Sequence, residues 1–594
     1  MKSKLNRHKV IFKPSNKEIY TEDNETLLEL ARLLDLKIDS ACGGMGSCGK
    51  CVVNIRGKGK VLACQYHPDS DLVVELPIRE SLGKGKFAFS KFLQDIKQIE
   101  PFTKKIYLEL EPPTLQDNED DLSRLKRFLK EKQGIDAHIS FKVLRKLPAV
   151  LRKSNWKVTV TVASGAKNEI IEVEPGKVEQ NFGLAIDIGT TTVAVALVDL
   201  LTGKVIDSET DYNKQIPLGE DVLSRINYAQ NGGLEELNKK VIETINPLIL
   251  TILQRTGFDK REVSSAVVAG NTVMTHLFLK LDPEYIRIEP YIPIANHLPS
   301  ISASDVGLQM DDYAKIHCVP GVSSYVGGDV VADIIASGMN KKQKLCLLID
   351  LGTNGEIVLG NKDWMLSCSC SAGPAFEGIG IEKGMRAVDG AIESLTISDT
   401  KIKYKLIGGE TAKGICGSGM IDLLAELLKE KIIDRAGEFN SENELVKVEA
   451  GTKKFVITKD VWVNDSDVKN IIRTKAAIFA GCRTLLASVD KTFEDVDEIF
   501  IAGGLGNYLD VEKAVQIGLL PDVSRKKFKF IGNGALAGAH AILLSKEKRD
   551  ESINISKKMA YLELSTENKF MDEFTSALFI PHTNLDLFPS VRKD

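Results

Sequence analysis

The sequence lacks several features that would place it in a specialised class of protein. Its longest apolar runs, such as residues 345–351, are far shorter than the roughly 18 residues that suggest a membrane span. The basic start, MKSKLNRHK, is not followed by an apolar stretch, so no signal peptide is expected. The sequence GxxxxGK(S/T) is also absent, which argues against a P-loop enzyme.

An excess of charge of one sign is lacking as well. The 78 Lys and Arg nearly balance the 82 Asp and Glu, leaving a formal net charge of −4, so the composition does not indicate nucleic-acid binding. Hydrophobic residues at 43% and charged residues at 27% are typical of folded globular chains. A length of 594 residues predicts about four domains. We therefore expect a soluble, cytoplasmic, multidomain protein without a nucleic-acid or membrane partner.

Cysteine is informative through its distribution. Four of the ten cysteines, Cys42, Cys48, Cys51 and Cys64, have the spacing C-x5-C-x2-C-x12-C, with several glycines between the first three. Iron–sulfur clusters need thiolate ligands and close approach of backbone N–H groups to sulfur, which glycine permits. Structural zinc is the alternative, but zinc ribbons usually have two C-x2-C pairs and only one is present here. These four cysteines are therefore predicted to ligate an iron–sulfur cluster.

The segments around this motif predict a small domain over residues 1–82. Strands are expected at 8–14, 17–21, 52–56 and 71–77, and a helix at 26–36 that begins with a capping box formed by Thr26 and Glu29. Residues 40–51 resemble the cluster loop of the [2Fe–2S] ferredoxins with a β-grasp fold, with the C-x5-C spacing of the adrenodoxin-like members. The gap before Cys64 is shorter than in those ferredoxins, so Cys64 is the least secure of the four ligands.

The next region is predicted to hold a linker at 83–116, with one strand at 105–111, and a small α+β domain at 117–180. A helix is expected at 120–133 and strands at 142–147, 157–162 and 169–173. No motif in this region carries chemistry.

Two similar strand–turn–strand segments follow. Asp187-Ile-Gly189-Thr190-Thr191 and Asp350-Leu-Gly352-Thr353-Asn354 each come at the end of an apolar strand and precede a second one. Backbone N–H groups and hydroxyls in such a turn can contact phosphate oxygens, while Asp187 orients Mg²⁺ and its waters. Their likeness indicates an internal duplication, in which two turns grip the phosphates of one nucleotide.

Two further glycine turns suit a close approach to a nucleoside or phosphate. One is Gly503-Gly504-Leu-Gly506-Asn507 after a buried strand at 498–502, and the other contains Gly417, ahead of a helix expected from Met420. Over residues 183–545 the set resembles the acetate kinase, sugar kinase, Hsp70 and actin superfamily of two-lobed ATPases. The resemblance implies an actin-like ATPase domain at 181–594 with a C-terminal extension. It implies catalytic roles for Asp187 and Asp350, and ATP binding by Gly189, Thr190, Thr191, Gly352, Thr353, Asn354, Gly417, Gly503, Gly504 and Asn507.

Three other features are weighed against simpler interpretations. Arg225 could contact a phosphate or a partner, and a surface arginine on a capped helix is an equally good interpretation. His276 is expected to be a packed or capping histidine rather than a base. Cys368 and Cys370 have no nearby partner for a second metal, so buried free thiols are favoured.

An electron carrier joined to an ATPase suggests electron transfer against a potential gradient, because downhill transfer needs no ATP. The whole chain resembles the reductive activators of corrinoid proteins. That resemblance implies an enzyme that passes one electron from a [2Fe–2S] cluster to the Co(II) centre of a corrinoid protein, giving Co(I), with ATP hydrolysis and Mg²⁺. It also implies a homodimer formed through the ATPase domain. The external low-potential electron donor is unidentified.

Two other functions remain open at this point: a small-molecule kinase with a fused redox domain, and an ATP-gated electron activator of another low-potential enzyme. A ferredoxin on an inert scaffold is disfavoured by the paired Asp-x-Gly-Thr turns.

Overall fold

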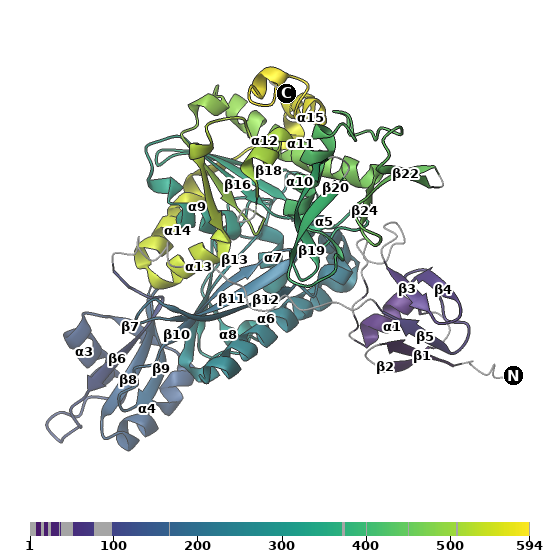
Figure 1. Cartoon of the computed structure of the whole chain (residues 1–594). Helices are drawn as coiled ribbons and strands as arrows, with labels where there is room; N and C mark the ends of the chain where they lie inside the picture. Colours follow the sequence, from purple (N-terminus) through teal and green to yellow (C-terminus); the bar gives the residue numbers. More distant parts are fainter. Residues whose placement is uncertain are drawn as a thin grey trace. The chain divides into compact units, whose positions relative to one another are not determined.

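A computed structural model describes most of the chain (Figure 1). The described residues are 7–13, 17–21, 25–34, 36, 38, 51–76, 98–165, 167–370, 373, 375–398, 401–449, 451–505 and 509–592. They form two compact units. One comprises Met1–Lys86 and Lys97–Cys318 together with Leu543–Lys546, and the other is built mainly from Val319–Ile542 and Glu547–Asp594.

The amino-terminal sheet has the mixed order expected of a β-grasp domain. Its strands run in the order β2-β1-β5-β3-β4, with β1 antiparallel to β2 and parallel to β5. The bounds are β1 (His8–Lys13), β2 (Lys17–Thr21), β3 (Val52–Ile55), β4 (Gly59–Leu62), β5 (Leu72–Glu75) and α1 (Leu27–Leu33). The predicted capping box is confirmed, since Thr26 and Glu29 bond each other's backbone N–H. Leu27 and Leu30 of α1 pack against Phe12 and Val74 of the sheet.

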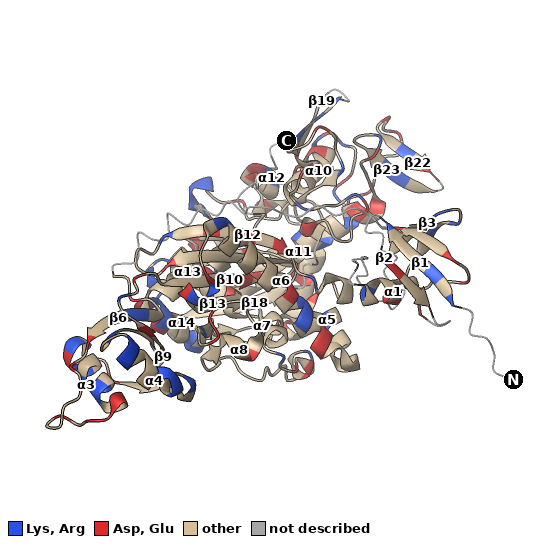
Figure 2. Cartoon of the chain, turned by 90° about the horizontal axis from the view of Figure 1, so that it is seen from below, with Lys and Arg blue, Asp and Glu red and all other residues tan. Residues whose placement is uncertain are grey.

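A second small sheet follows, in the order β6-β8-β9-β7. The bounds are β6 (Thr103–Glu109), β7 (Ala137–Ile139), β8 (Lys157–Ala163), β9 (Asn168–Pro175), α3 (Asp121–Gln133) and α4 (Phe141–Lys153). β6 lies within the expected linker but pairs with β8. The strand expected at 142–147 is wrong, because Ser140 caps a helix that buries Val143, Leu147 and Leu151 at helical spacing. Figure 2 shows the Lys and Arg residues along α3 and α4.

The rest of the first unit is built on a six-stranded sheet, β12-β11-β10-β13-β15-β14. Its strands are β10 (Phe182–Ile188), β11 (Thr192–Asp199), β12 (Val205–Tyr212), β13 (Val263–Gly270), β14 (Ile301–Ser302) and β15 (Lys315–Cys318). Its helices are α5 (Val222–Tyr228), α6 (Leu234–Thr256), α7 (Thr272–Phe278) and α8 (Ala303–Val306). β10 is antiparallel to β11 and parallel to β13.

The second unit repeats this layout in the sheet β26-β25-β16-β17-β18-β27. Its strands are β16 (Cys346–Leu351), β17 (Gly355–Gly360), β18 (Met365–Cys370), β25 (Glu498–Ala502), β26 (Phe528–Gly532) and β27 (Met559–Tyr561). β16 is antiparallel to β17 and parallel to β25, as β10 is to β11 and β13. The internal duplication indicated by the two Asp-x-Gly-Thr segments is thus confirmed in the strand order.

Two three-stranded sheets and several helices complete the second unit. The strands are β19 (Ala391–Ser398), β20 (Lys401–Ile407), β21 (Gly414–Ile415), β22 (Val446–Glu449), β23 (Thr452–Val456) and β24 (Trp462–Asn464). The helices are α9 (Gly328–Ser337), α10 (Gly417–Lys429), α11 (Asp465–Ala487), α12 (Val511–Gln516), α13 (Gly534–Leu544), α14 (Lys546–Lys558) and α15 (Asn568–Ala577). α10 begins at Gly417, three residues before the expected start. None of the described helices is both long enough and apolar enough to cross a bilayer.

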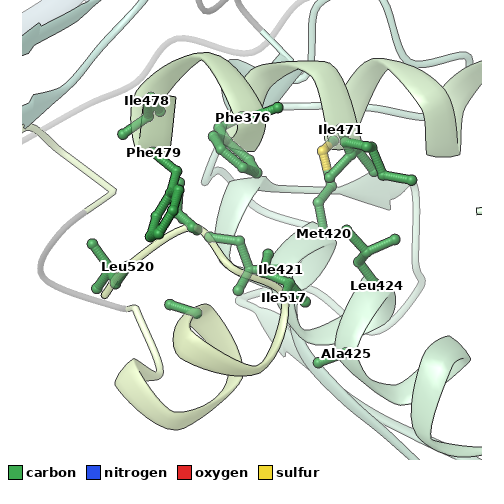
Figure 3. Close-up of a cluster of buried hydrophobic side chains, with 14 of the residues drawn as sticks. Phe376, Met420, Ile421, Leu424, Ala425, Ile471, Ile478, Phe479, Ile517 and Leu520 are labelled. Carbon is green, nitrogen blue, oxygen red and sulfur yellow. The ribbon is translucent and has the colours of Figure 1, made fainter. Parts of the chain in front are cut away.

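The core of the second unit lies between α10, α11 and α12. Figure 3 shows Met420, Leu424, Ile471, Phe479 and Ile517 converging in it. The C-terminal extension is fastened to this core by Lys475 of α11, which is fully buried. The Lys475 amino group donates to the carbonyls of Phe579 at 2.7 Å and Pro581 at 2.8 Å.

Candidate functional site

Two of the four predicted cluster ligands meet at the hairpin of β3 and β4. Cys51 precedes β3, Cys64 follows β4, and their Sγ atoms lie 3.1 Å apart. The backbone N–H of Cys64 donates to Cys51 Sγ at 3.4 Å. Neighbouring soft sulfur ligands with an N–H group turned towards sulfur fit an iron–sulfur cluster. Cys42 and Cys48 lie outside the described residues, within which no group of three or more metal-ligating side chains is found.

The first predicted phosphate turn joins β10 and β11. Gly189 donates to the Thr192 carbonyl at 2.9 Å, and a Cβ atom at Gly189 would lie 2.7 Å from that same oxygen, so a larger residue would open the turn. Asp187 is the penultimate residue of β10, and Thr190 and Thr191 are almost wholly buried.

The carbonyls of this turn are held by side chains from elsewhere in the same unit. Asn213 donates to the Gly189 carbonyl at 3.0 Å, and Arg225 donates to the Thr190 carbonyl. In a trans peptide the C=O and N–H groups point in opposite directions. Fixing these two carbonyls therefore turns the N–H groups of Thr190 and Thr191 the other way, which is the arrangement that a phosphate-binding turn needs.

Arg225 is the main element of this support, and the surface position considered for it is wrong. It is fully buried, and its guanidinium also donates to the Gly219 carbonyl and to Gln215 Oε1, each at 2.8 Å. Because its role depends on residues 35 positions away in sequence, no local pattern could have revealed it. Arg225 therefore positions the turn.

The second unit brings three predicted segments together. β16 pairs with β25 so that Asp350 lies beside Ala502, and the glycine turn begins at the next residue. Gly503 has a φ of +91°, and a Cβ atom there would lie 2.9 Å from Asp350 Oδ1. The Gly352 N–H donates to the Asn354 carbonyl at 3.2 Å and closes the second turn. Gly504 is exposed, and Asn507 lies outside the described residues.

The remaining predicted residue, Gly417, begins α10. A Cβ atom there would lie 2.3 Å from the Phe376 carbonyl, so this approach also requires glycine. α10 is tied to α12, the helix that follows the Gly503 turn, by Lys513. Its ammonium lies 2.8 Å from Asp422 Oδ2 and 3.5 Å from Glu426 Oε1.

Carboxylates cluster around Asp350. Glu356 lies opposite Asp350 across the β16–β17 hairpin and is buried. Burial raises the pKa of Glu356 well above its usual range, and the nearby Asp329 and Asp350 raise it further. Burial also raises the pKa of Asp329 in α9.

Glu377 is a second residue that positions a phosphate turn. Glu377 ends the short 3₁₀ helix η6 (Ala375–Glu377) and accepts a hydrogen bond from Thr353 Oγ1 at 2.8 Å. The residue before it, Phe376, supplies the carbonyl that packs on Gly417. η6 therefore contacts both the second phosphate turn and the start of α10.

Four family models match consecutive stretches that together span most of the chain. Residues 10–69 match a 2Fe-2S iron-sulfur cluster binding domain, 94–180 the RACo linker region, 182–342 the RACo middle region and 344–592 the C-terminal domain of RACo, the ASKHA domain. A corrinoid activation enzyme, RamQ of Eubacterium limosum, is 32% identical over 95% of this chain and 98% of its own. The chain belongs to the RACo family.

Two further relatives also have names that refer to corrinoid proteins. A solved structure of a reductive activator for corrinoid, iron–sulfur protein is 44% identical, covers 98% of this chain and 100% of its own, and has a TM-score of 0.79. A [Co(II) methylated amine-specific corrinoid protein] reductase of Methanosarcina barkeri is 26% identical over 66% of this chain and 75% of its own. The predicted fold, a [2Fe–2S] ferredoxin-type domain followed by an ATPase domain of the actin and Hsp70 type, is confirmed.

Two simpler interpretations from the sequence are also confirmed. His276 is 1% exposed and its ring nitrogens contact the Thr272 carbonyl and the Ile294 N–H, so it is a packed histidine. Cys368 and Cys370 are buried free thiols, and burial raises the pKa of both.

We expect Glu377→Ala to lower ATP turnover about ten- to a hundredfold, because a hydrogen bond to a charged group contributes roughly 1.5–3 kcal/mol and its loss frees the second turn. Steady-state ATPase assays over a range of ATP concentrations measure this. Thr353→Val should cause the same loss, Glu377→Gln should retain part of the activity, and the double variant Glu377→Ala/Thr353→Val should be no worse than either single one. Fully additive losses would contradict a shared role.

Proposed function

We propose that this protein is an ATP-dependent reductive activator that passes one electron to the Co(II) centre of a corrinoid protein and restores Co(I). The observation that carries the proposal is the presence, in one chain, of a cysteine pair suited to a cluster and two ATPase turns of the same construction. The reductive activators among its relatives support it.

The energetics favour a nucleotide-driven conformational change. An electron moved against about 100 mV costs roughly 2.3 kcal/mol. A gap of a few hundred millivolts is then comparable with the roughly 5.5 kcal/mol that inverts a two-state equilibrium. Binding and hydrolysis of ATP can select the complex in which transfer is favourable without ATP contacting the electron path.

The predicted cluster ligands, carboxylates and phosphate turns each have a role in this proposal. Cys42, Cys48, Cys51 and Cys64 hold the cluster, and the Cys64 N–H stabilises negative charge on the Cys51 sulfur. A bound [2Fe–2S] cluster stores and releases a single electron. Asp187 and Asp350 orient Mg²⁺ and its waters, while the N–H groups of the two turns bind phosphate.

Cellular context is part of the same proposal. The free buried thiols suit a reducing compartment, so we place the protein in the cytoplasm. Two copies pair through the ATPase domain, as the family resemblance implies, and an external low-potential donor reloads the cluster.

The test mixes the reduced protein, ATP, Mg²⁺ and a Co(II) corrinoid protein and follows the absorption band of Co(I). We expect Co(I) to form only when hydrolysable ATP is present. Equal formation without ATP would contradict coupling. ATPase activity that transfers phosphate to a metabolite and ignores corrinoid proteins would favour a small-molecule kinase.

A further inference from the structure

An exposed apolar surface follows α7 in the first unit. Its large side chains are Tyr285, 62% exposed, Ile288, 41%, Ile292, 59%, and Ile294, 58%. The chain folds back on itself here, since the Ile292 N–H donates to the Tyr285 carbonyl at 3.0 Å and the Tyr291 N–H to the Ile288 carbonyl at 2.7 Å. The four side chains therefore come from one compact segment, which we term the 285–294 surface.

A hydrogen bond to His276 of α7 fixes the end of this segment. The Ile294 N–H donates to His276 Nε2 at 3.1 Å, and His276 Nδ1 lies 2.7 Å from the Thr272 carbonyl. The ring must accept at Nε2 and donate at Nδ1, so it is neutral, and burial lowers its pKa accordingly. Ile286, between the exposed side chains, is 1% exposed and packs inward.

The other end of α7 reaches the first phosphate turn. Asn271 caps the helix by accepting the Met274 N–H at 2.9 Å, and its amide donates to Thr190 Oγ1 at 3.0 Å. Every residue of α7 is buried, and Asn238 of α6 donates to the carbonyls of Leu277 and Phe278 at its carboxyl end. α7 is thus a packed connection between the Thr190 turn and the 285–294 surface.

The exposed area of the 285–294 surface distinguishes a stable dimer interface from a transient one. With about 200 Å² for each fully exposed large apolar side chain, the four expose on the order of 400 Å². Apolar patches of this size on a soluble protein are often binding sites. A stable dimer buries roughly 800 Å² or more on each partner, with a larger apolar share, so this area suits the centre of a transient interface instead.

The charges around the surface indicate which kind of partner protein is complementary to it. Asp282 and Glu289 are exposed beside it and Glu284 is half-buried, whereas the guanidinium of Arg287 is engaged with Gln230 at 2.6 Å. Lys280 is paired with Glu235. An apolar centre with an acidic rim fits a protein surface that has an apolar centre and basic residues around it.

We propose that the 285–294 surface is the docking site for the corrinoid protein, and that α7 makes docking depend on the nucleotide at the Thr190 turn. This inference rests on the proposed function, in which acceptor binding must respond to ATP. A ligand at the turn that moves Asn271 shifts α7, and His276 transmits the shift to Ile294.

The docking test uses Ile292→Glu in the full chain, with Leu201→Glu as the matched control because Leu201 is 60% exposed in another loop of the same unit. The acceptor probes are a corrinoid iron–sulfur protein and a methylamine-specific corrinoid protein, each in the Co(II) state. For the Ile292→Glu variant we expect the KM for the acceptor to rise at least about tenfold, which is about 1.4 kcal/mol of lost binding. Its basal ATPase activity and cluster absorption should equal those of the wild type.

Three other outcomes of this test would contradict the docking site or the proposed function. Unchanged acceptor kinetics in the Ile292→Glu variant would overturn the docking site. A changed oligomeric state in light scattering would overturn it in favour of self-association through this surface. A wild-type chain that reduces neither probe would instead contradict the proposed function, and the docking proposal with it.

The coupling through α7 has its own measurement. The affinity for the Co(II) probe is compared with and without a non-hydrolysable ATP analogue, and the wild type should show a difference of several-fold. His276→Leu should bring this ratio close to one without changing the affinity for the analogue, while His276→Gln, which keeps a hydrogen-bond acceptor, should retain part of it. An unchanged ratio in the His276→Leu variant would overturn the connection.

Discussion

Replacing Cys51 by alanine is expected to abolish Co(II) reduction while leaving ATP binding intact. Cys51 Sγ lies 3.1 Å from Cys64 Sγ and receives the Cys64 N–H, so its loss removes one proposed ligand and the group that orients a second. An iron–sulfur cluster that loses a thiolate ligand is no longer held in its usual coordination. The visible absorption of the cluster should disappear, and Co(I) should form only at the background rate.

ATP binding should be retained because Cys51 and the two phosphate turns belong to different sheets. Cys51 belongs to the small β1–β5 sheet and its own core, whereas both phosphate turns are built on other sheets. Nucleotide affinity, measured by titration calorimetry, should equal that of the wild type. Cys346→Ala is the matched control, because Cys346 is equally buried but lies in β16, and it should keep the cluster spectrum. Loss of nucleotide binding along with the cluster in the Cys51→Ala variant would contradict the independence of the two parts.

The parts of this fold that sequence alone predicted are those with local causes. The capping box at Thr26 and the two Asp-x-Gly-Thr hairpins depend on residues within a few positions of one another, and each has the predicted form. The strand expected at 142–147 failed because the apolar residues of this segment do not alternate with polar ones. The buried residues Val143, Leu147 and Leu151 recur every four positions, which is helical spacing and is evident only over the longer segment.

The site was predicted less completely than the fold. Motifs identified the turns, but the side chains that hold them come from distant positions: Arg225 reaches Thr190, and Glu377 reaches Thr353. A buried arginine looks like a surface arginine in sequence, since only its acceptors distinguish the two. The turns can be recognised from their sequence pattern, whereas the side chains that position them are known only once the chain is folded.

Asp187→Asn is expected to have the opposite effect to Cys51→Ala, lowering ATP turnover roughly 10²–10³-fold while the cluster spectrum stays intact. The amide lacks the charge that we propose orients Mg²⁺. It has nearly the same shape as the carboxylate, so the turn should keep its structure. Gly189 still closes the hairpin, and Asn213 still holds its carbonyl. ATPase assays and the visible spectrum of the same sample measure both effects.

The control for this variant is Asp207→Asn in β12, a strand of the same sheet. Asp207 pairs with Arg255 at 2.7 Å near the surface, and such pairs contribute about 1 kcal/mol or less to stability, so turnover should be unchanged. Because electron transfer is proposed to need the nucleotide cycle, Asp187→Asn should also stop Co(I) formation although its cluster is fully reducible. Continued Co(I) formation by this variant at the wild-type rate would show that ATP hydrolysis and electron transfer are separate activities of one chain.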